Sequence, residues 1–376
     1  MPCLRPVVFS AVMILSHIAI KSFDLVVALT GGGPGYSSDL PATFMYAHAF
    51  TRAQIGMGSA SAILMLVACW RSWCLISIRN CGAVDMDNVI RSRTPAARVW
   101  RLMLHLTLLV AALWYLLPLA VMVLTSIKPL DEIGAGSLLA LPDNPTLAPW
   151  LKAWGSACTG MRCDGVSGYF WNSFAIVIPA VIIATLIGAL NGYALTKWRF
   201  KGELVFAMML FGCFIPFQVI LLPMAQTLGW LGLSSSRAGL IFVHVVFGIA
   251  FTTLFFRNFY VSIPDELVSA AKLDGAGFFR IFWRILLPVS KPIIVVSVIW
   301  QFTQIWNDFL FGVAFSGHDT QPVTVALNNL VNTSTGVKEY NVDMAAAMIA
   351  ALPTLVVYVL AGKYFVRGLT AGSVKG

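Results

Sequence analysis

Residues 262–292 read SIPDELVSAAKLDGAGFFRIFWRILLPVSKP, a charged stretch between two long apolar runs. Its polar side chains include Asp265, Glu266, Lys272 and Arg280. One charge at the centre of a membrane-spanning helix costs about 2.5–3.5 kcal/mol, so a segment with this many charges does not cross a bilayer. Its apolar residues nevertheless recur at helical spacing. We therefore predict helical structure that lies along the membrane surface.

The rest of the chain has the composition of an integral membrane protein. Of 376 residues, 59% are hydrophobic and 11% are charged, whereas soluble domains carry about 25% charged residues. The apolar runs are continuous and long enough to cross a bilayer as helices, unlike the short alternating strands of a membrane barrel. We predict an all-α polytopic membrane protein with about eight transmembrane helices. The expected spans are residues 6–28, 57–78, 102–126, 169–195, 203–226, 237–257, 292–315 and 343–366.

Lys and Arg lie in alternate loops, which predicts the orientation of the spans. Basic residues gather in residues 79–101, 197–201, 262–292 and the C-terminal tail. Because basic short loops stay in the cytoplasm, both termini are expected on the cytoplasmic side of a bacterial-type inner (plasma) membrane. Contact with anionic lipid headgroups accounts for the net charge of +9, and no nucleic-acid partner is expected.

Local signals divide the charged stretch into two helices. Ser262 followed by Asp265 predicts a capping box, with Pro264 in the first helical turn. Gly275 interrupts this helix, and Pro288 ends the second one. An interfacial helix that only anchors the chain to headgroups is the alternative. The bend between paired helices favours a docking element for another protein.

The pattern ELVSAAKLDGAGFFRIFWRILLP resembles the EAA loop of ABC-importer permeases, which fits a cleft on a cytoplasmic ATPase. The segments at 169–200, 306–311 and 362–376 extend the resemblance to the carbohydrate-uptake, maltose-type group. Ser269 stands where that family often has Glu, and Glu266 is the alternative acidic contact. The resemblance implies that the ATPase-coupling residues are Glu266, Ser269, Ala270, Ala271, Asp274, Gly275, Arg280 and Pro288.

An internal repeat separates the beginning of the chain from the rest. MPCLRP at 1–6 aligns with LPVSKP at 287–292, and MGSASAILMLV at 57–67 aligns with MAAAMIAALPT at 344–354. Repeats of this kind indicate duplicated topology in transporters. Residues 21–50 also resemble the region after the coupling loop of the partner permease. The expected domains are residues 1–80, a fragment with the last two helices of a partner permease; residues 81–98, a junction between fused reading frames; and residues 99–376, a six-helix permease domain.

Polar residues are concentrated in one predicted span, at Gln301, Gln304, Asn307 and Asp308. Positions 301, 304 and 308 share a face of a helix. Polar side chains at membrane depth usually face a cavity or another helix. We predict that the four residues line a substrate path, with hydrogen bonds to a partner subunit as the alternative.

The cysteines do not predict a metal site. The spacings of Cys69, Cys74 and Cys81 do not match zinc-ligand patterns, and no cofactor is expected. Cys158 and Cys163 fall on the predicted outer side, where an oxidising periplasm permits a disulfide. Two free thiols are the alternative.

The sequence contains no phosphate-binding loop and no hydrolase motif, so the chain is not expected to be an enzyme. The resemblance implies ATP hydrolysis by an ABC ATPase subunit dimer, an intact second permease subunit and a periplasmic sugar-binding protein. It suggests a monosaccharide such as glucose or mannose, with glycerol phosphate and oligosaccharides as alternatives. The rival class is an ion-coupled secondary transporter or channel, for which Asp24 and Asp308 are the candidate intramembrane acids.

Overall fold

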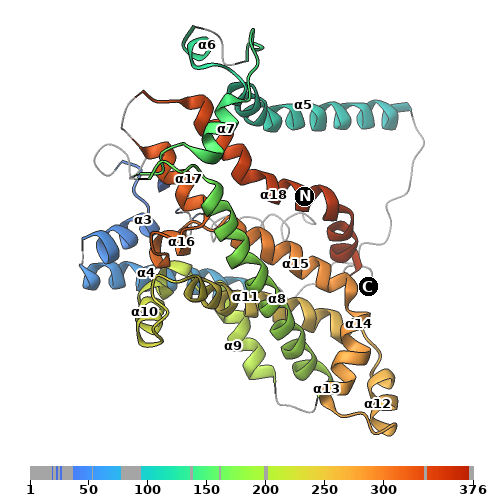
Figure 1. Cartoon of the computed structure of the whole chain (residues 1–376). Helices are drawn as coiled ribbons and strands as arrows, with labels where there is room; N and C mark the ends of the chain where they lie inside the picture. The colour runs from blue at the N-terminus through green and yellow to red at the C-terminus, as the bar shows by residue number, and fades with distance from the viewer. Residues whose placement is uncertain are drawn as a thin grey trace. The chain divides into compact units, whose positions relative to one another are not determined.

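The computed structural model describes residues 19, 23, 26–27, 37–52, 54–77, 95–135, 139–160, 162–198, 202–333 and 337–371. Over these residues every regular secondary-structure element is a helix, and the only β-type pairing is one isolated bridge between Ser235 and Ser316. Figure 1 shows the helices along the chain. The predicted all-α fold class is confirmed for the described part of the chain.

The described helices follow one another along the chain. They are α3 (Pro41–Tyr46), the π-helix η2 (Ala47–Thr51), α4 (Ile55–Ser77), α5 (Pro95–Ser126), α6 (Leu130–Ala135), α7 (Ala148–Gly155), α8 (Ser167–Lys197), α9 (Glu203–Phe214), α10 (Phe217–Trp230), α11 (Arg237–Val261), α12 (Asp265–Leu273), α13 (Phe278–Ile281), the π-helix η3 (Phe282–Leu286), α14 (Leu287–Val289), α15 (Lys291–Trp306), α16 (Leu310–Phe315), α17 (Val323–Asn332) and α18 (Tyr340–Ala371).

The chain forms two compact units. The first contains residues 75–168 and 327–351, and the second contains residues 11–74, 169–326 and 352–376. The surface segment 262–292 and the polar residues of the predicted substrate path all belong to the second unit, together with α3 and residues 55–74 of α4.

Four described helices are long and apolar enough to cross a membrane: residues 102–126 of α5, α8, α11 and residues 340–361 of α18. A fifth span results if residues 278–289 and α15, which are bent by 80° at Ser290, count as one. The expected number of eight is not confirmed. Most of the first expected span, 6–28, lies outside the described residues.

Two expected spans are interrupted. Residues 203–226 form two helices, α9 and α10, because the backbone turns to an extended conformation at Ile215 and Pro216 follows it. Proline disfavours helical backbone in the residue before it, which explains the break. Residues 292–315 are likewise divided, because α15 ends at Trp306 and α16 begins at Leu310.

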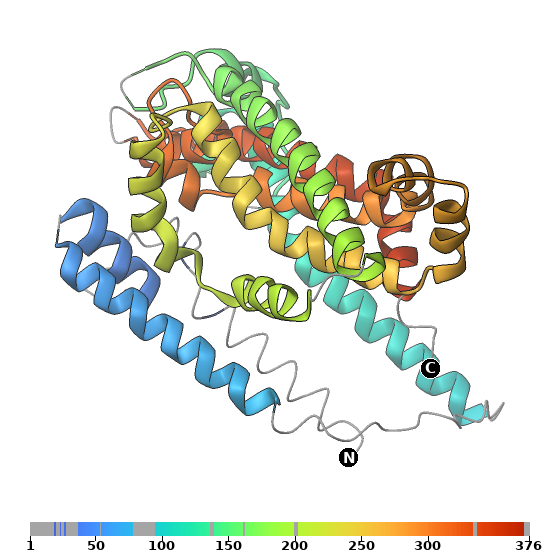
Figure 2. The same ribbon diagram turned by 90° about the horizontal axis from the view of Figure 1, so that it is seen from below.

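Small residues let α8 and α11 approach closely, and Figure 2 shows the two helices side by side. A Cβ atom built on Gly188 would lie 2.2 Å from Thr252 Oγ1. The same hydroxyl donates to the carbonyl oxygen of Ala184 at 2.9 Å. Close backbone approach through Gly, with Ser and Thr bridging, is typical of helices packed in membranes. Residues 262–292 pack against one end of this helix pair.

Candidate functional site

Residues 262–292, hereafter the coupling segment, contain the predicted helix, glycine bend and second helix. The first helix is α12, and the second runs through α13, η3 and α14. Gly275 in the bend has φ +73°, a conformation that glycine adopts without steric cost. Nothing lies within 4 Å of a Cβ built on this residue. The turn therefore requires glycine for its backbone and leaves open space around it.

The predicted capping box is wrong. Ser262 belongs to the end of α11, where its hydroxyl donates to the carbonyl oxygen of Phe259 at 2.7 Å. Helix α12 begins at Asp265, with Pro264 as its N-cap residue and no side-chain cap. Because Ser262 satisfies a carbonyl of the preceding helix, it does not reach the first turn of the next one.

The coupling segment is fixed to α8 and α11 by a buried apolar cluster. Tyr193 stacks on Phe278 with ring centroids 4.5 Å apart. Ser290 shares a hydrogen bond with Tyr260 at 3.0 Å, which ties the end of the segment to α11. The cluster consists of Ala189, Tyr193, Phe256, Tyr260, Ile263, Val268, Ala271, Ile281, Phe282 and Leu286. These side chains therefore join the segment and the helix ends in one closely packed core.

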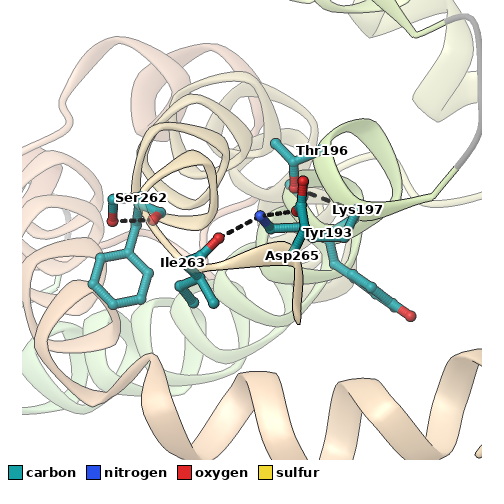
Figure 3. Close-up of polar contacts among 8 residues, drawn as sticks. Tyr193, Thr196, Lys197, Ser262, Ile263 and Asp265 are labelled. Atoms are coloured by element: carbon teal, nitrogen blue, oxygen red, sulfur yellow. Dashed lines mark hydrogen bonds and ion pairs between the residues drawn. The ribbon is translucent and has the colours of Figure 1, made fainter. Parts of the chain in front are cut away.

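A buried lysine adds a polar contact to this interface (Figure 3). Lys197 Nζ donates to Asp265 Oδ1 and to the carbonyl oxygen of Ile263, each at 2.5 Å. The Lys197 side chain is 5% exposed, whereas that of Asp265 is 82% exposed. The hydrogen bond from Lys197 and its charge hold the pKa of Asp265 below its ordinary value. The contact was not predicted from the sequence, because the two residues lie far apart in the chain.

Seven of the eight predicted coupling residues have exposed side chains or backbone: Glu266, Ser269, Ala270, Asp274, Gly275, Arg280 and Pro288. Ala271 is the exception, because it is 7% exposed and packs in the apolar cluster. Its side chain therefore belongs to the face of the coupling segment that packs against α8 and α11. The structure also exposes large apolar side chains that the sequence analysis did not select, with Leu273 at 90% and Phe279 at 63%.

The second candidate site is a cavity of about 300 Å³ in the second unit. Gln301, Gln304, Asn307 and Asp308 all line it, so the structure brings the four predicted path residues together. Most of the surrounding wall was not predicted from the sequence, because its aromatic residues come from several separate segments. That wall includes the side chains of Phe23, Phe217, His244, Phe247, Phe251, Trp300 and Phe311.

Two of the four polar residues also form hydrogen bonds with nearby backbone groups. Gln301 Nε2 donates to the carbonyl oxygen of Gly248 at 2.9 Å, which joins α15 to α11. Asp308 Oδ2 accepts from the backbone N–H groups of Phe311 and Gly312 at 3.0 and 3.1 Å. The same oxygen lies 3.9 Å from His244 Nε2. Asp308 thus caps α16, while Gln304 and Asn307 have exposed side chains.

Cys158 and Cys163 form a disulfide in the loop between α7 and α8. Next to this loop, Lys152 Nζ lies 2.5 Å from a carboxylate oxygen of Glu339. The disulfide and the ion pair belong to the first unit. Among the described residues, no group of three or more His, Cys, Asp or Glu side chains is arranged to hold a metal ion.

The apolar helices and the docked surface segment define a multi-pass membrane protein. The sequence pattern of the binding-protein-dependent transport system inner membrane component matches residues 184–370. A probable ABC transporter permease of Pyrococcus horikoshii is 39% identical over 277 residues, covering 73% of this chain and 98% of that protein. The chain belongs to this family of transport-system inner membrane components.

Two further proteins show the breadth of the similarity. The xylose/arabinose import permease of Haloferax volcanii is 32% identical over 278 residues, covering 68% of this chain and 87% of that protein. The crystal structure of a bacterial ABC transporter involved in the import of alginate matches with a TM-score of 0.63 at 21% identity. That match covers 74% of this chain and 100% of the other, and it supports the fold.

Proposed function

We propose that the chain is the membrane permease subunit of an ATP-driven sugar importer, coupled to a separate ATPase through residues 262–292. The observation that carries this proposal is the geometry of the coupling segment. One face is buried against α8 and α11, and the opposite face presents charged and apolar side chains. A partner that pushes on the exposed face transmits its movement to both spanning helices. This arrangement supports an ABC ATPase subunit dimer as the source of energy.

The cavity supports a neutral sugar as the substrate. Amide side chains offer donors and acceptors for hydroxyl groups, and aromatic rings offer flat apolar faces. Among the described lining residues there is no Lys or Arg, which disfavours an anionic solute such as glycerol phosphate. The relative from Haloferax volcanii is named as a xylose/arabinose permease. We therefore propose a monosaccharide such as glucose or mannose, delivered by a periplasmic sugar-binding protein.

The proposed assembly also requires a second, intact permease subunit. Residues 99–376 form the permease domain in this account, and residues 1–80 derive from a partner permease through the junction at 81–98. The match to nearly the whole Pyrococcus horikoshii protein by 73% of this chain supports the division. We place the protein in the plasma membrane with both termini in the cytoplasm.

An ion-coupled transporter has less support. Asp24 lies outside the described residues. Asp308 accepts two backbone hydrogen bonds as a helix cap, which gives its carboxylate a structural role.

Reconstitution in liposomes tests the proposed function. The importer, assembled with its ATPase, second permease and binding protein, is assayed for uptake of radiolabelled glucose, mannose, xylose and glycerol 3-phosphate. We expect ATP-dependent uptake of a neutral sugar, and its loss in Asp274→Trp and Gly275→Trp variants that still insert into the membrane. Arg237→Glu, exposed at the opposite end of α11, is the control. Uptake by the Trp variants at the rate of the unmodified protein contradicts the coupling role.

A further inference from the structure

The N-terminal hairpin, formed by α3, η2 and α4, is a packed element of the second unit. Ser61 Oγ donates to the carbonyl oxygen of Pro41 at 3.2 Å, which joins α4 to α3. A Cβ atom built on Gly58 would lie 2.7 Å from Ala49 Cβ, so α4 also packs closely on η2. Figure 2 shows the two blue helices side by side. The hairpin therefore has close contacts of its own.

This hairpin is in contact with the part of the chain that forms the cavity. Helix α3 packs against α10, the helix that carries the cavity-lining Phe217 and Gln218. Met45 of α3 is 1% exposed. Residues 11–74 and 169–326 belong to the same compact unit.

Phe23 extends this contact to the cavity itself. Its ring stacks on Phe309 at a centroid distance of 6.4 Å and meets Tyr46 of α3 edge-on at 5.1 Å. Phe23 is 3% exposed and is one of the lining residues of the cavity. Phe309 directly follows Asp308, the residue that caps α16. Phe23 thus packs on the loop that carries two of the predicted path residues.

We propose that the N-terminal segment docks within its own chain onto the permease domain, and that Phe23 forms one wall of the substrate cavity. The second part of this inference rests on the proposed transport function of the cavity. In this account the segment is an integral part of the transport unit, although it precedes the region that resembles a complete permease. Removing the ring opens the cavity beside Asn307 and Asp308, so the size of Phe23 sets which solutes are retained there.

Photocrosslinking in the full chain tests the docking without requiring transport. Phe23 is replaced by benzoylphenylalanine, which preserves an aromatic ring, and linked peptides are identified by mass spectrometry. Mixing unlabelled chains with nitrogen-15-labelled chains distinguishes links within one chain from links between copies. We expect links within one chain to the peptide that contains Phe309. The same replacement at Ile63, which is 58% exposed on α4, is the control and should give no such link. No link from position 23, or links only between copies, overturns the proposal.

Uptake kinetics test the role of Phe23 as a wall. Phe23→Leu keeps an apolar side chain and loses the flat ring, and Phe23→Tyr keeps the ring. Because an aromatic contact contributes about 0.5–1.5 kcal/mol, we expect Phe23→Leu to raise the KM for the transported sugar about twofold to tenfold. Phe23→Tyr should raise KM less than Phe23→Leu does, because it keeps the ring, and the control Ile63→Leu should not change KM. If Phe23→Leu leaves KM unchanged while the intrachain link still forms, Phe23 is not a wall of the substrate cavity. Only the docking of the N-terminal segment then stands. An importer that fails to transport any sugar while the link forms contradicts the proposed function instead.

Discussion

Lys197, the last residue of α8, holds Asp265, the first residue of α12, with Nζ 2.5 Å from Oδ1 although 68 residues separate them in the chain. The lysine is the buried partner and also donates to the Ile263 carbonyl oxygen. It thereby fixes the start of the coupling segment to the end of a spanning helix.

Replacing Lys197 and replacing Asp265 should have unequal effects on hydrogen exchange in the coupling segment and on uptake. Lys197→Met removes the charged donor of two hydrogen bonds, and a bond from a charged group to a carbonyl oxygen, such as that of the buried Ile263, contributes about 1.5–3 kcal/mol. We expect faster amide hydrogen exchange over residues 262–273 and slower ATP-dependent uptake. Asp265→Asn should have a much smaller effect, because Asp265 is largely exposed and the lysine keeps the Ile263 carbonyl oxygen. Equal effects of the two variants would contradict the assignment of Lys197 as the anchor.

The pair should be insensitive to pH in the physiological range. The hydrogen bond from Lys197 and its charge lower the pKa of Asp265 from its ordinary value of 3.8. A lowered pKa in the folded chain gives stabilisation that is fully present above the unfolded value and is lost as pH falls through the folded value. After correction for intrinsic exchange rates, protection of residues 262–273 should stay constant from about pH 5 to 8. A transition in that range that Asp265→Asn abolishes would contradict the lowered pKa.

Because α8 packs closely on α11, a larger residue at Gly188 should lower the stability of the protein. A methyl group there would lie 2.2 Å from Thr252 Oγ1 and 2.8 Å from the Thr252 backbone. Overpacking of this kind costs about 1–3 kcal/mol, so Gly188→Ala should lower thermal stability in detergent. Gly168→Ala in the same helix is the matched control, because nothing lies within 4 Å of the added atom. Similar melting temperatures for the two variants would be inconsistent with the close approach of these helices.

Gln301 and Gln304 should differ in how their loss affects the protein. Gln301→Ala removes a buried hydrogen bond to Gly248, so it should lower stability by about 1 kcal/mol as well as uptake. Gln304→Ala should reduce uptake with little change in stability, because its side chain is exposed and lines the cavity. Thermal unfolding and uptake are measured on the same preparations. A stable Gln304→Ala importer with unchanged KM and rate would exclude this residue from the path.

The disulfide in the α7–α8 loop should stabilise only its surroundings. Closing a short loop contributes about 2 kcal/mol in the chain-entropy description. Cys158→Ser should therefore increase hydrogen exchange over residues 156–166, while exchange over the coupling segment remains unchanged. Cys163→Ser should give the same result, since either change removes the same bond. Unaltered exchange in both variants would contradict a stabilising role.

Patterns local in sequence predicted much of this structure. The expected span 169–195 corresponds to α8, and the helix, bend and helix of residues 262–292 are present. These features follow from apolar length and from glycine, which a sequence displays directly. All four predicted path residues line one cavity. The helix face expected to join positions 301, 304 and 308 is not continuous, however, because α15 ends at Trp306.

Features that depend on distant contacts could not be predicted in the same way. Ala271 faces the apolar cluster because α12 packs on α8 and α11, and amphipathic spacing alone did not show which alanine is buried. Ser262 forms its hydrogen bond to the preceding helix rather than to the next. The contact between Phe23 and Phe309 joins residues far apart in the sequence and has no local pattern.

In the proposed importer, the exposed face of the coupling segment contacts the ATPase. The most direct measurement is photocrosslinking in the assembled importer, with benzoylphenylalanine in place of Glu266. The same replacement at Arg237, at the opposite end of α11, is the control. We predict a covalent product between position 266 and the ATPase subunit, and none from position 237. Absence of a product from position 266, or equal products from both positions, would contradict this contact.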